Sequence, residues 1–358
     1  MAEDYRTDDG FVIDAVVHAY NFNDDNFRSD LARSFAGLSY GMVMTTGDQD
    51  RVSQDVYSSH DWSIDEIAEM TFVESDVDMA IYHGVPLDDY FFDGLSSNQK
   101  GIDMAQRWPD RVRWYTGVNP LDGKAALEQA EHHVKDLGAI GLKFYPERYT
   151  EGRGAEPVRF DGVMAAPFME KAIELGVPVA VHKFVPAGQG VTDNYRIADV
   201  EACAARYPEL QIEVVHSGMA FLEETIYMLV RYPNVWANLE VTTALAVLFK
   251  RRFAEAMGAL MSSGAFDRLI FATGACLVHP QPVIDAMREF TVPDDLVEGF
   301  GFPQMTPEIL EGIMGANFAR LHGIDIAAVK AKIADDEFSR RRRELPGRPD
   351  RWSCVNAG

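Results

Sequence analysis

The chain has 358 residues, of which 47% are hydrophobic, and its 56 acidic residues against 33 basic ones give a formal net charge of −23. An acidic surface of this kind repels phosphate backbones and anionic membranes, so the composition argues against nucleic-acid and membrane partners. Three widely spaced cysteines exclude a disulfide framework, and no apolar run approaches the roughly 20 residues that span a bilayer. We expect a soluble cytoplasmic protein that acts on small molecules.

Eight short apolar runs, rich in β-branched and aromatic residues, alternate with stretches of helical periodicity. In chain order these runs are residues 11–18, 77–86, 111–120, 138–146, 176–184, 210–218, 234–242 and 267–275. Near-continuous apolarity is typical of parallel strands that helices cover on the outside. The pattern predicts an α/β fold, a (β/α)8 TIM barrel.

Two segments exceed what eight strand-and-helix units need. Residues 23–76 are too long for a first crossover, and we interpret them as an insertion over the mouth of the barrel, with one or two helices. Residues 293–358 read as a helical C-terminal tail. We treat residues 1–358 as a single domain. The basic run at 340–343 lies among acidic residues and predicts a solvated helix face with local ion pairs.

Polar side chains follow several of the predicted strands, at the barrel face where active sites of this fold lie. These are His18, His83, Lys143, His182, His216, Glu240 and, on a less regular loop, His279. A lone histidine in an apolar run is more often a core residue than a ligand, but convergence on one face favours a metal site. Imidazole and carboxylate ligands suit iron, manganese and zinc, and six such groups exceed what one tetrahedral zinc needs. The set could therefore hold two metals.

The other histidines fit a metal role less well. We place His132 and His133 on the solvent side of a helix rich in Glu and Lys, and His322 in the tail. His60 lies in the insertion, which could cover the site.

At these positions the sequence resembles the amidohydrolase superfamily, in the amidohydrolase 2 branch that includes the aminocarboxymuconate semialdehyde decarboxylases. The resemblance rests on Asp14 followed by His18, "PVAVHKF", "IEVVHSGMAFLEE" and "ILEGIMGANFARLHGID", in that order. Family members read Asp-x-His-x-His on strand one, where this chain has Val16 and His18. They end strand eight in Gly-Thr/Ser-Asp, where this chain has Gly274. Neither Val16 nor Gly274 can ligate a metal or act as a base.

The chain is further similar to the barrel-type nonheme diiron monooxygenases of platensimycin and platencin biosynthesis. That resemblance implies two iron ions per chain, dioxygen, an electron donor and an apolar diterpenoid-type substrate. The resemblance supplies no ligand list. From their strand-end positions we expect the ligands to be His18, His83, His182, His216 and Glu240, with Lys143 near or on the metal, and we expect Lys143 and His216 to be catalytic. The resemblance also allows a homodimer.

Aromatic residues near the strand ends could line an apolar substrate pocket, although packing explains many such residues. The candidates are Tyr20, Tyr90, Phe91, Tyr145, Phe184 and Phe221. Lys183 and Arg148 could meet a substrate carboxylate or serve as surface ion-pair partners. Cys276 could be a nucleophile with His279, but a buried inert thiol is the better interpretation.

Two alternatives stay open from the sequence. The chain could be a mononuclear zinc or manganese hydrolase or decarboxylase, which would need a base from somewhere other than strand eight. It could also be a barrel that binds a ligand without catalysis.

Overall fold

Eight parallel strands form the centre of the molecule, in a computed structural model that describes residues 10–150, 153–184 and 190–356. They are β1 (Ile13–Val17), β2 (Met79–His83), β3 (Val112–Val118), β4 (Gly141–Phe144), β7 (Val179–His182), β8 (Ile212–Val215), β9 (Val235–Asn238) and β10 (Leu269–Ile270). They pair in this order. The first and last strands are joined by Ala15 N–H to Phe271 O at 3.1 Å and Gly274 N–H to Val16 O at 2.9 Å. The predicted TIM barrel is confirmed, with a strand inside each of the eight apolar runs.

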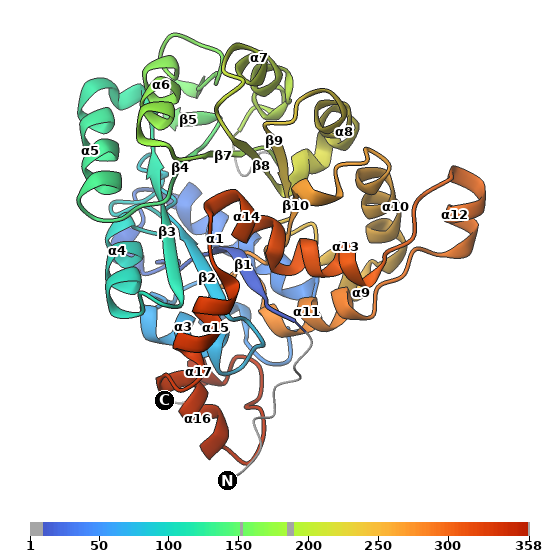
Figure 1. Ribbon diagram of the computed structural model, residues 1–358. Helices are drawn as coiled ribbons and strands as arrows, with labels where there is room; N and C mark the ends of the chain where they lie inside the picture. Colours follow the sequence, from blue (N-terminus) through green and yellow to red (C-terminus); the bar gives the residue numbers. More distant parts are fainter. Residues whose placement is uncertain (1–9, 151–152, 185–189, 357–358) are drawn as a thin grey trace.

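A ring of helices surrounds these strands (Figure 1). They are α3 (Ile64–Phe72), α4 (Asn98–Arg107), α5 (Gly123–Lys135), α6 (Ala166–Leu175), α7 (Ala198–Arg206), α8 (Leu222–Arg231), α10 (Lys250–Met261) and α11 (Pro280–Arg288), with the short α9 (Leu245–Leu248) before α10. Each longer helix turns one apolar face to the barrel. Burial of the strands on both sides explains why the sequence shows apolar runs rather than alternation.

The segment after β1 contains α1 (Asp30–Met44) and α2 (Gln54–Tyr57) before α3, so it holds three α-helices where we expected one or two. A capping box of Ser63 and Glu66 starts α3, which packs beside α4 as the first helix of the outer ring. The chain between β1 and α3 runs beside the end of β1, because Trp62 N–H donates to Tyr20 O at 2.9 Å.

A two-stranded antiparallel hairpin of β5 (Glu147–Thr150) and β6 (Gly154–Pro157) follows β4 and was not predicted. Both strands are polar and at least partly exposed, so they carry no apolar signal that sequence analysis could detect.

The tail is helical, as expected. It comprises α12 (Asp294–Phe300), α13 (Pro307–Glu311), the π-helical turn η6 (Gly312–Ala316), α14 (Asn317–His322), α15 (Ile326–Ile333), α16 (Glu337–Glu344) and α17 (Ser353–Asn356). Asn317 ties the tail to the start of β10 by donating to Phe266 O and Leu269 O, both at 2.8 Å. The middle of the tail therefore packs at the end of the barrel opposite the strand-end side chains, whereas Trp352 near the C-terminus packs against Tyr57 and Trp62.

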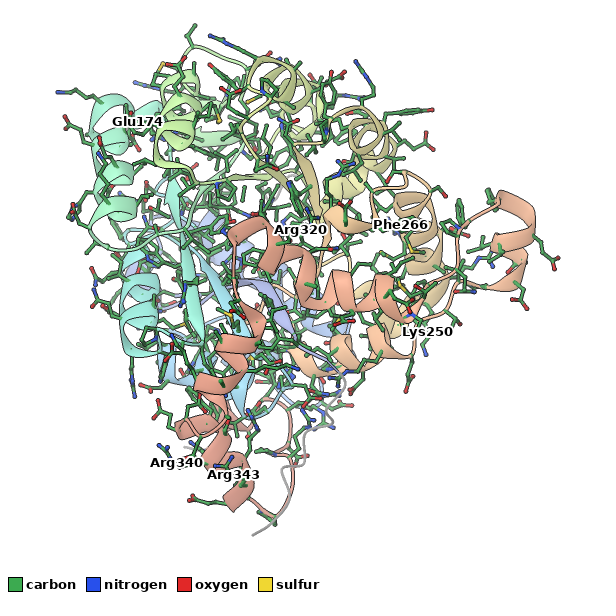
Figure 2. The ribbon with its side chains drawn as sticks, viewed as in Figure 1. Glu174, Lys250, Phe266, Arg320, Arg340 and Arg343 are labelled. Carbon is green, nitrogen blue, oxygen red and sulfur yellow. The ribbon has the colours of Figure 1, made fainter. Side chains whose placement is uncertain are left out.

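The basic run lies on α16, far from the barrel centre (Figure 2). Arg340 and Arg343 pair with Asp335, which confirms the expected local ion pairs. Arg342 departs from that expectation, because it is buried and donates to Phe72 O at 2.7 Å. No helix in the described part of the chain is long and apolar enough to cross a membrane.

Candidate metal centre

The carboxyl ends of the barrel strands bring six of the predicted side chains into one buried region. His83 and His182 are the last residues of β2 and β7, and Lys143 lies in β4. His18 and His216 directly follow β1 and β8, and Glu240 comes two residues after β9. Parallel strands in a closed barrel all end at one face, so residues far apart in sequence meet here.

The side-chain atoms that could bind a metal form a chain of contacts, which runs from His18 through Glu240 and His216 to His182. His18 Nε2 lies 3.1 Å from Glu240 Oε1, and His216 Nε2 lies 3.5 Å from Glu240 Oε2. His216 Nε2 is also 3.1 Å from His182 Nδ1. The two oxygens of Glu240 thus face two different histidines, so the carboxylate lies between them.

Backbone carbonyls orient two of the rings. His18 Nδ1 lies 3.0 Å from His83 O, and His216 Nδ1 lies 3.1 Å from Glu240 O. A ring whose Nδ1–H donates to a carbonyl presents its Nε2 lone pair to the other side, which is the arrangement a metal ligand needs. Both Nε2 atoms point to Glu240.

Burial and neighbouring charges determine the protonation states of the side chains in this region. Burial lowers the pKa of His216 to about 4, against the opposing effect of Glu240, and it holds the pKa of His182 and His83 well below the usual range. Burial alone would raise the pKa of Glu240, but His216, His18 and Lys143 together outweigh it and hold that pKa well below its usual range. At neutral pH His83, His182 and His216 are therefore neutral imidazoles and Glu240 is an ionised carboxylate, which is the protonation state that binds metals.

Several buried polar atoms here have no hydrogen-bond partner among the described residues: both ring nitrogens of His83, Lys143 Nζ and Glu240 Oε2. Such atoms cost free energy unless something satisfies them. Lone pairs of neutral imidazole and carboxylate are satisfied by a cation, so the donor set fits a metal by its chemistry. Within the described ranges, however, no three His, Cys, Asp or Glu side chains are arranged as they stand to hold one. The donors bond to each other instead.

Backbone strain concentrates at the same place. Five non-glycine residues have positive φ within the described ranges, and three of them adjoin the site: His216 (φ 64°), Ser217 (φ 54°) and Val241 (φ 61°). This left-handed region is costly for residues with a Cβ and is found most often where function requires it. These strained conformations occur at His216 itself and at the residue after Glu240.

The two departures from the family pattern are visible in the packing. Val16 is fully buried in the barrel interior and supplies no ligand. Gly274 has φ +77°, and a Cβ built on it would come within 2.9 Å of Glu240 Oε1. The carboxylate of Glu240 therefore lies against the position from which a strand-eight aspartate would extend.

A polar layer beneath the site was missed in the sequence. Glu213 of β8 is fully buried, accepts a hydrogen bond from Asn238 Nδ2 at 2.9 Å and another from the Tyr115 hydroxyl. Burial raises its pKa. The single charged residue inside the apolar run "IEVVH" was the sequence signal for Glu213. Asp14 in "VIDAVV" is a second buried acid inside an apolar run, and it accepts a hydrogen bond from Thr273 N–H.

Three of the proposed pocket aromatics lie against the site histidines. Tyr20 stacks on His18 with ring centroids 5.0 Å apart, and Tyr145 stacks on His182 at 4.9 Å. The ring of Phe184 is 4.8 Å from that of His216.

The other three pocket candidates lie elsewhere. Phe91 is fully buried among Phe22, Phe27 and Phe35. Tyr90 packs on Tyr149. Phe221 lies under the guanidinium of Arg196. Phe91 and Phe221 have no ring contact with a site histidine among the described residues, and the place of all three in a substrate pocket stays a prediction.

Some sequence interpretations are corrected. His279 is not at the site, because it is buried against Glu74 at 3.0 Å and caps α11. His133 is buried and bonded to Thr116, so only His132 faces solvent as predicted. Burial raises the pKa of the Cys276 thiol to about 12, in agreement with an inert cysteine.

The two cations considered for a substrate carboxylate are already engaged. Lys183 is fully buried and pairs with Asp199 at 2.8 Å. Arg148 pairs with Asp122 on the surface. Both are ion-paired, as one interpretation expected, but the pair of Lys183 is buried and not at the surface.

Solved structures of similar fold span nearly the whole chain. An uncharacterised TIM-barrel protein from Bordetella bronchiseptica has a TM-score of 0.59 at 17% identity, covering 87% of this chain and 98% of its own. The 5-carboxyvanillate decarboxylase of Novosphingobium aromaticivorans, with bound manganese, has a TM-score of 0.58 at 17% identity, covering 88% and 98%. The 2,6-dihydroxybenzoate decarboxylase from Rhizobium has a TM-score of 0.57 at 14% identity, covering 88% and 99%.

At these identities the likeness establishes the fold. No curated protein sequence matches the chain. A family model described as amidohydrolase matches residues 86–324, about two thirds of the chain. The match includes Lys143, His182, His216 and Glu240, whereas His18 and His83 precede it. The chain belongs to the amidohydrolase 2 family.

Proposed function

We propose that the protein is a nonheme diiron monooxygenase that hydroxylates an apolar, diterpenoid-type intermediate with dioxygen. The observation that carries the proposal is His83, which is fully buried and whose ring nitrogens make no well-formed hydrogen bond, although the Ala15 backbone lies near the ring. The four groups linked around Glu240 already suffice for one metal. A further unsatisfied imidazole beside them is explained by a second metal ion.

The residues divide into two sets about Glu240. His18 and His83 would hold one iron, and His182 and His216 the other, with Glu240 available to both. Lys143, whose pKa burial lowers, would adjoin both. Bound iron would supply the reduction of dioxygen and the attack on an unactivated C–H bond.

The surrounding side chains would orient the substrate and exclude water. Tyr20, Tyr145 and Phe184 cover the faces of three site histidines with apolar rings. Burial holds the pKa of Tyr20 and Tyr145 well above the usual range, so both phenols stay protonated. An apolar wall of this kind favours a hydrocarbon skeleton over a charged aromatic acid.

A mononuclear zinc- or manganese-dependent hydrolase or decarboxylase is the second candidate. It is favoured by the family and by the manganese-containing decarboxylase of similar fold. It is also favoured by the closeness of Glu240 to Gly274, since Glu240 could replace the missing strand-eight aspartate as a base. In that case His83 and Lys143 would belong to the scaffold.

The metal content of protein purified without added metal separates the two candidates. We would measure iron, zinc and manganese per chain in the wild type, His83→Ala and Glu240→Ala, with His133→Ala as a control because that buried histidine lies outside the barrel. About two iron ions in the wild type, lost in both site variants but not in the control, with oxygen uptake on an apolar acid, would support the monooxygenase. One zinc or manganese, retained in His83→Ala, would overturn it in favour of the second candidate.

A further inference from the structure

An apolar groove lies between α8 and α10 on the outside of the barrel. Its volume is about 530 Å³, and most of its walls are apolar, formed by Met219, Leu222, Ile226, Ala256, Ala259 and Phe302. Apolar surface in contact with water is unfavourable, and contact with a second apolar surface releases that water. The groove is therefore a candidate docking surface.

Exposed apolar side chains border this groove. Tyr227 lines it and is 67% exposed, and Val230, one turn further along α8, is 61% exposed. Phe300, at the end of α12, is 69% exposed, and its ring stacks at 5.2 Å on that of Phe302 in the groove wall. Single exposed apolar residues are common on soluble proteins, but a contiguous set around a groove marks an interaction surface.

The helix α12 projects from the body of the molecule. Figure 1 shows it standing clear of the barrel, and Leu296 is the buried residue of this helix. After α12 the chain returns to the groove, where Phe302 packs so closely on α10 that a Cβ added to Gly258 would lie 2.2 Å from its ring. The molecule therefore carries a projection beside a hollow. Two copies related by a two-fold axis can each place their projection in the hollow of the other.

Charges around the groove favour a second copy of this chain as the partner. With a net charge of −23, two copies repel one another unless opposite charges meet where they touch. Arg252 lines the groove and makes no ion pair within the described ranges, whereas Arg251 beside it is paired with Asp295. The projecting helix carries Asp294 and Glu298, which likewise have no ion pair in the described part of the chain. These acids and Arg252 are complementary across a two-fold axis.

We propose that the chain forms a two-fold symmetric homodimer in which α12 of each copy fills the groove between α8 and α10 of the other. Phe300 of one copy packs against Tyr227 of its partner, and Arg252 meets the acidic side chains of the partner's α12. The contact lies on the outside of the barrel, so it is independent of the chemistry at the candidate metal centre.

The test is sedimentation equilibrium of the full chain, purified without added metal, over a range of concentrations. Phe300→Ser and Tyr227→Ser remove the apolar contacts. Arg252→Glu reverses the charge at the groove, and a triple variant adds Asp294→Lys and Glu298→Lys to it. Val163→Ser is the matched control, because Val163 is 87% exposed but precedes α6, on the other side of the barrel from α12 (Figure 1).

We expect dimers for the wild type and for Val163→Ser. Phe300→Ser and Tyr227→Ser should each raise the dissociation constant of the dimer about 30-fold or more, as loss of a central aromatic contact does. Arg252→Glu should also weaken the dimer, and the triple variant should restore it. The substituted side chains are all exposed, so the fold should be retained, which far-ultraviolet circular dichroism checks.

A wild type that stays monomeric at every concentration would overturn the proposal. So would a dimer that both serine variants leave unchanged, since it would use another surface, or one that Val163→Ser weakens equally. A triple variant no stronger than Arg252→Glu alone would overturn the pairing of α12 with the groove.

Discussion

Gly274→Ala is the most informative single change, because it adds one methyl group beside the site and removes no ligand. The new Cβ would lie 2.9 Å from Glu240 Oε1 and 3.2 Å from its Cγ. Glu240 cannot move without breaking its 3.1 Å contact with His18 Nε2. The substitution therefore tests whether the position of Glu240 controls metal binding.

The free energy of the change has two parts. Alanine in the left-handed conformation costs about 1–2 kcal/mol. Displacement of Glu240 would weaken a buried bond to an ionised group, which contributes about 1.5–3 kcal/mol. We expect Gly274→Ala to lower the free energy of unfolding by about 3 kcal/mol.

Gly176→Ala supplies the matched control. Gly176 ends α6 at φ +68°, and nothing lies within 4 Å of its added Cβ. It carries the same backbone strain without any contact, so it should cost about 1–2 kcal/mol and leave the metal content unchanged.

The assay is urea unfolding of both variants and the wild type, together with metal content per chain. Gly274→Ala should lose more stability than Gly176→Ala and should also lose metal. Equal losses of stability in the two variants, with full metal content in Gly274→Ala, would refute the role assigned to Glu240.

Three further predictions concern buried groups around the barrel. Tyr57→Phe removes an unpartnered hydroxyl and should leave the free energy of unfolding unchanged or raise it by about 1 kcal/mol; a clear loss in urea unfolding would show a hidden partner. Asp14 has its pKa raised by burial from 3.8 to about 7. Its folded pKa exceeds the unfolded value, so its contribution to stability is complete below about pH 4 and is lost as the pH rises through about 7, at about 1.4 kcal/mol per unit. The free energy of unfolding of Asp14→Asn, measured across this pH range, should increase relative to that of the wild type as the pH rises. A constant difference would contradict the assignment. Lys183→Met leaves the Asp199 carboxylate buried without its cation and should cost about 3–5 kcal/mol in thermal or urea unfolding. Its metal content should stay unchanged, and a loss of metal without a loss of stability would contradict the structural role.

The local pattern of apolar runs in the sequence was sufficient to predict the barrel. Residues buried on both faces of a parallel strand must be apolar, so runs such as 77–86 and 176–184 mark strands even without alternation. The fold then places every strand end at one face, which is why His18, His182 and His216 could be grouped from the sequence. The absence of a ligand at Val16 and of an acid at Gly274 was likewise visible in the residue types.

The sequence could not decide which strand-end histidines face the site, since orientation depends on the tertiary path of each loop. His216 directly follows β8 and lies in the barrel mouth, whereas His279 lies on the longer loop after β10 and caps α11 against Glu74. The hairpin after β4 was also hidden, because polar and partly exposed strands carry no hydrophobic period. Only the packed structure showed Glu240 against Gly274, because a contact between residues 34 positions apart arises from barrel closure and not from local pattern. What the sequence by itself determined was the order of the barrel strands and the chemistry available at their ends. The direction of each side chain was decided by closure of the barrel, which no single segment specifies.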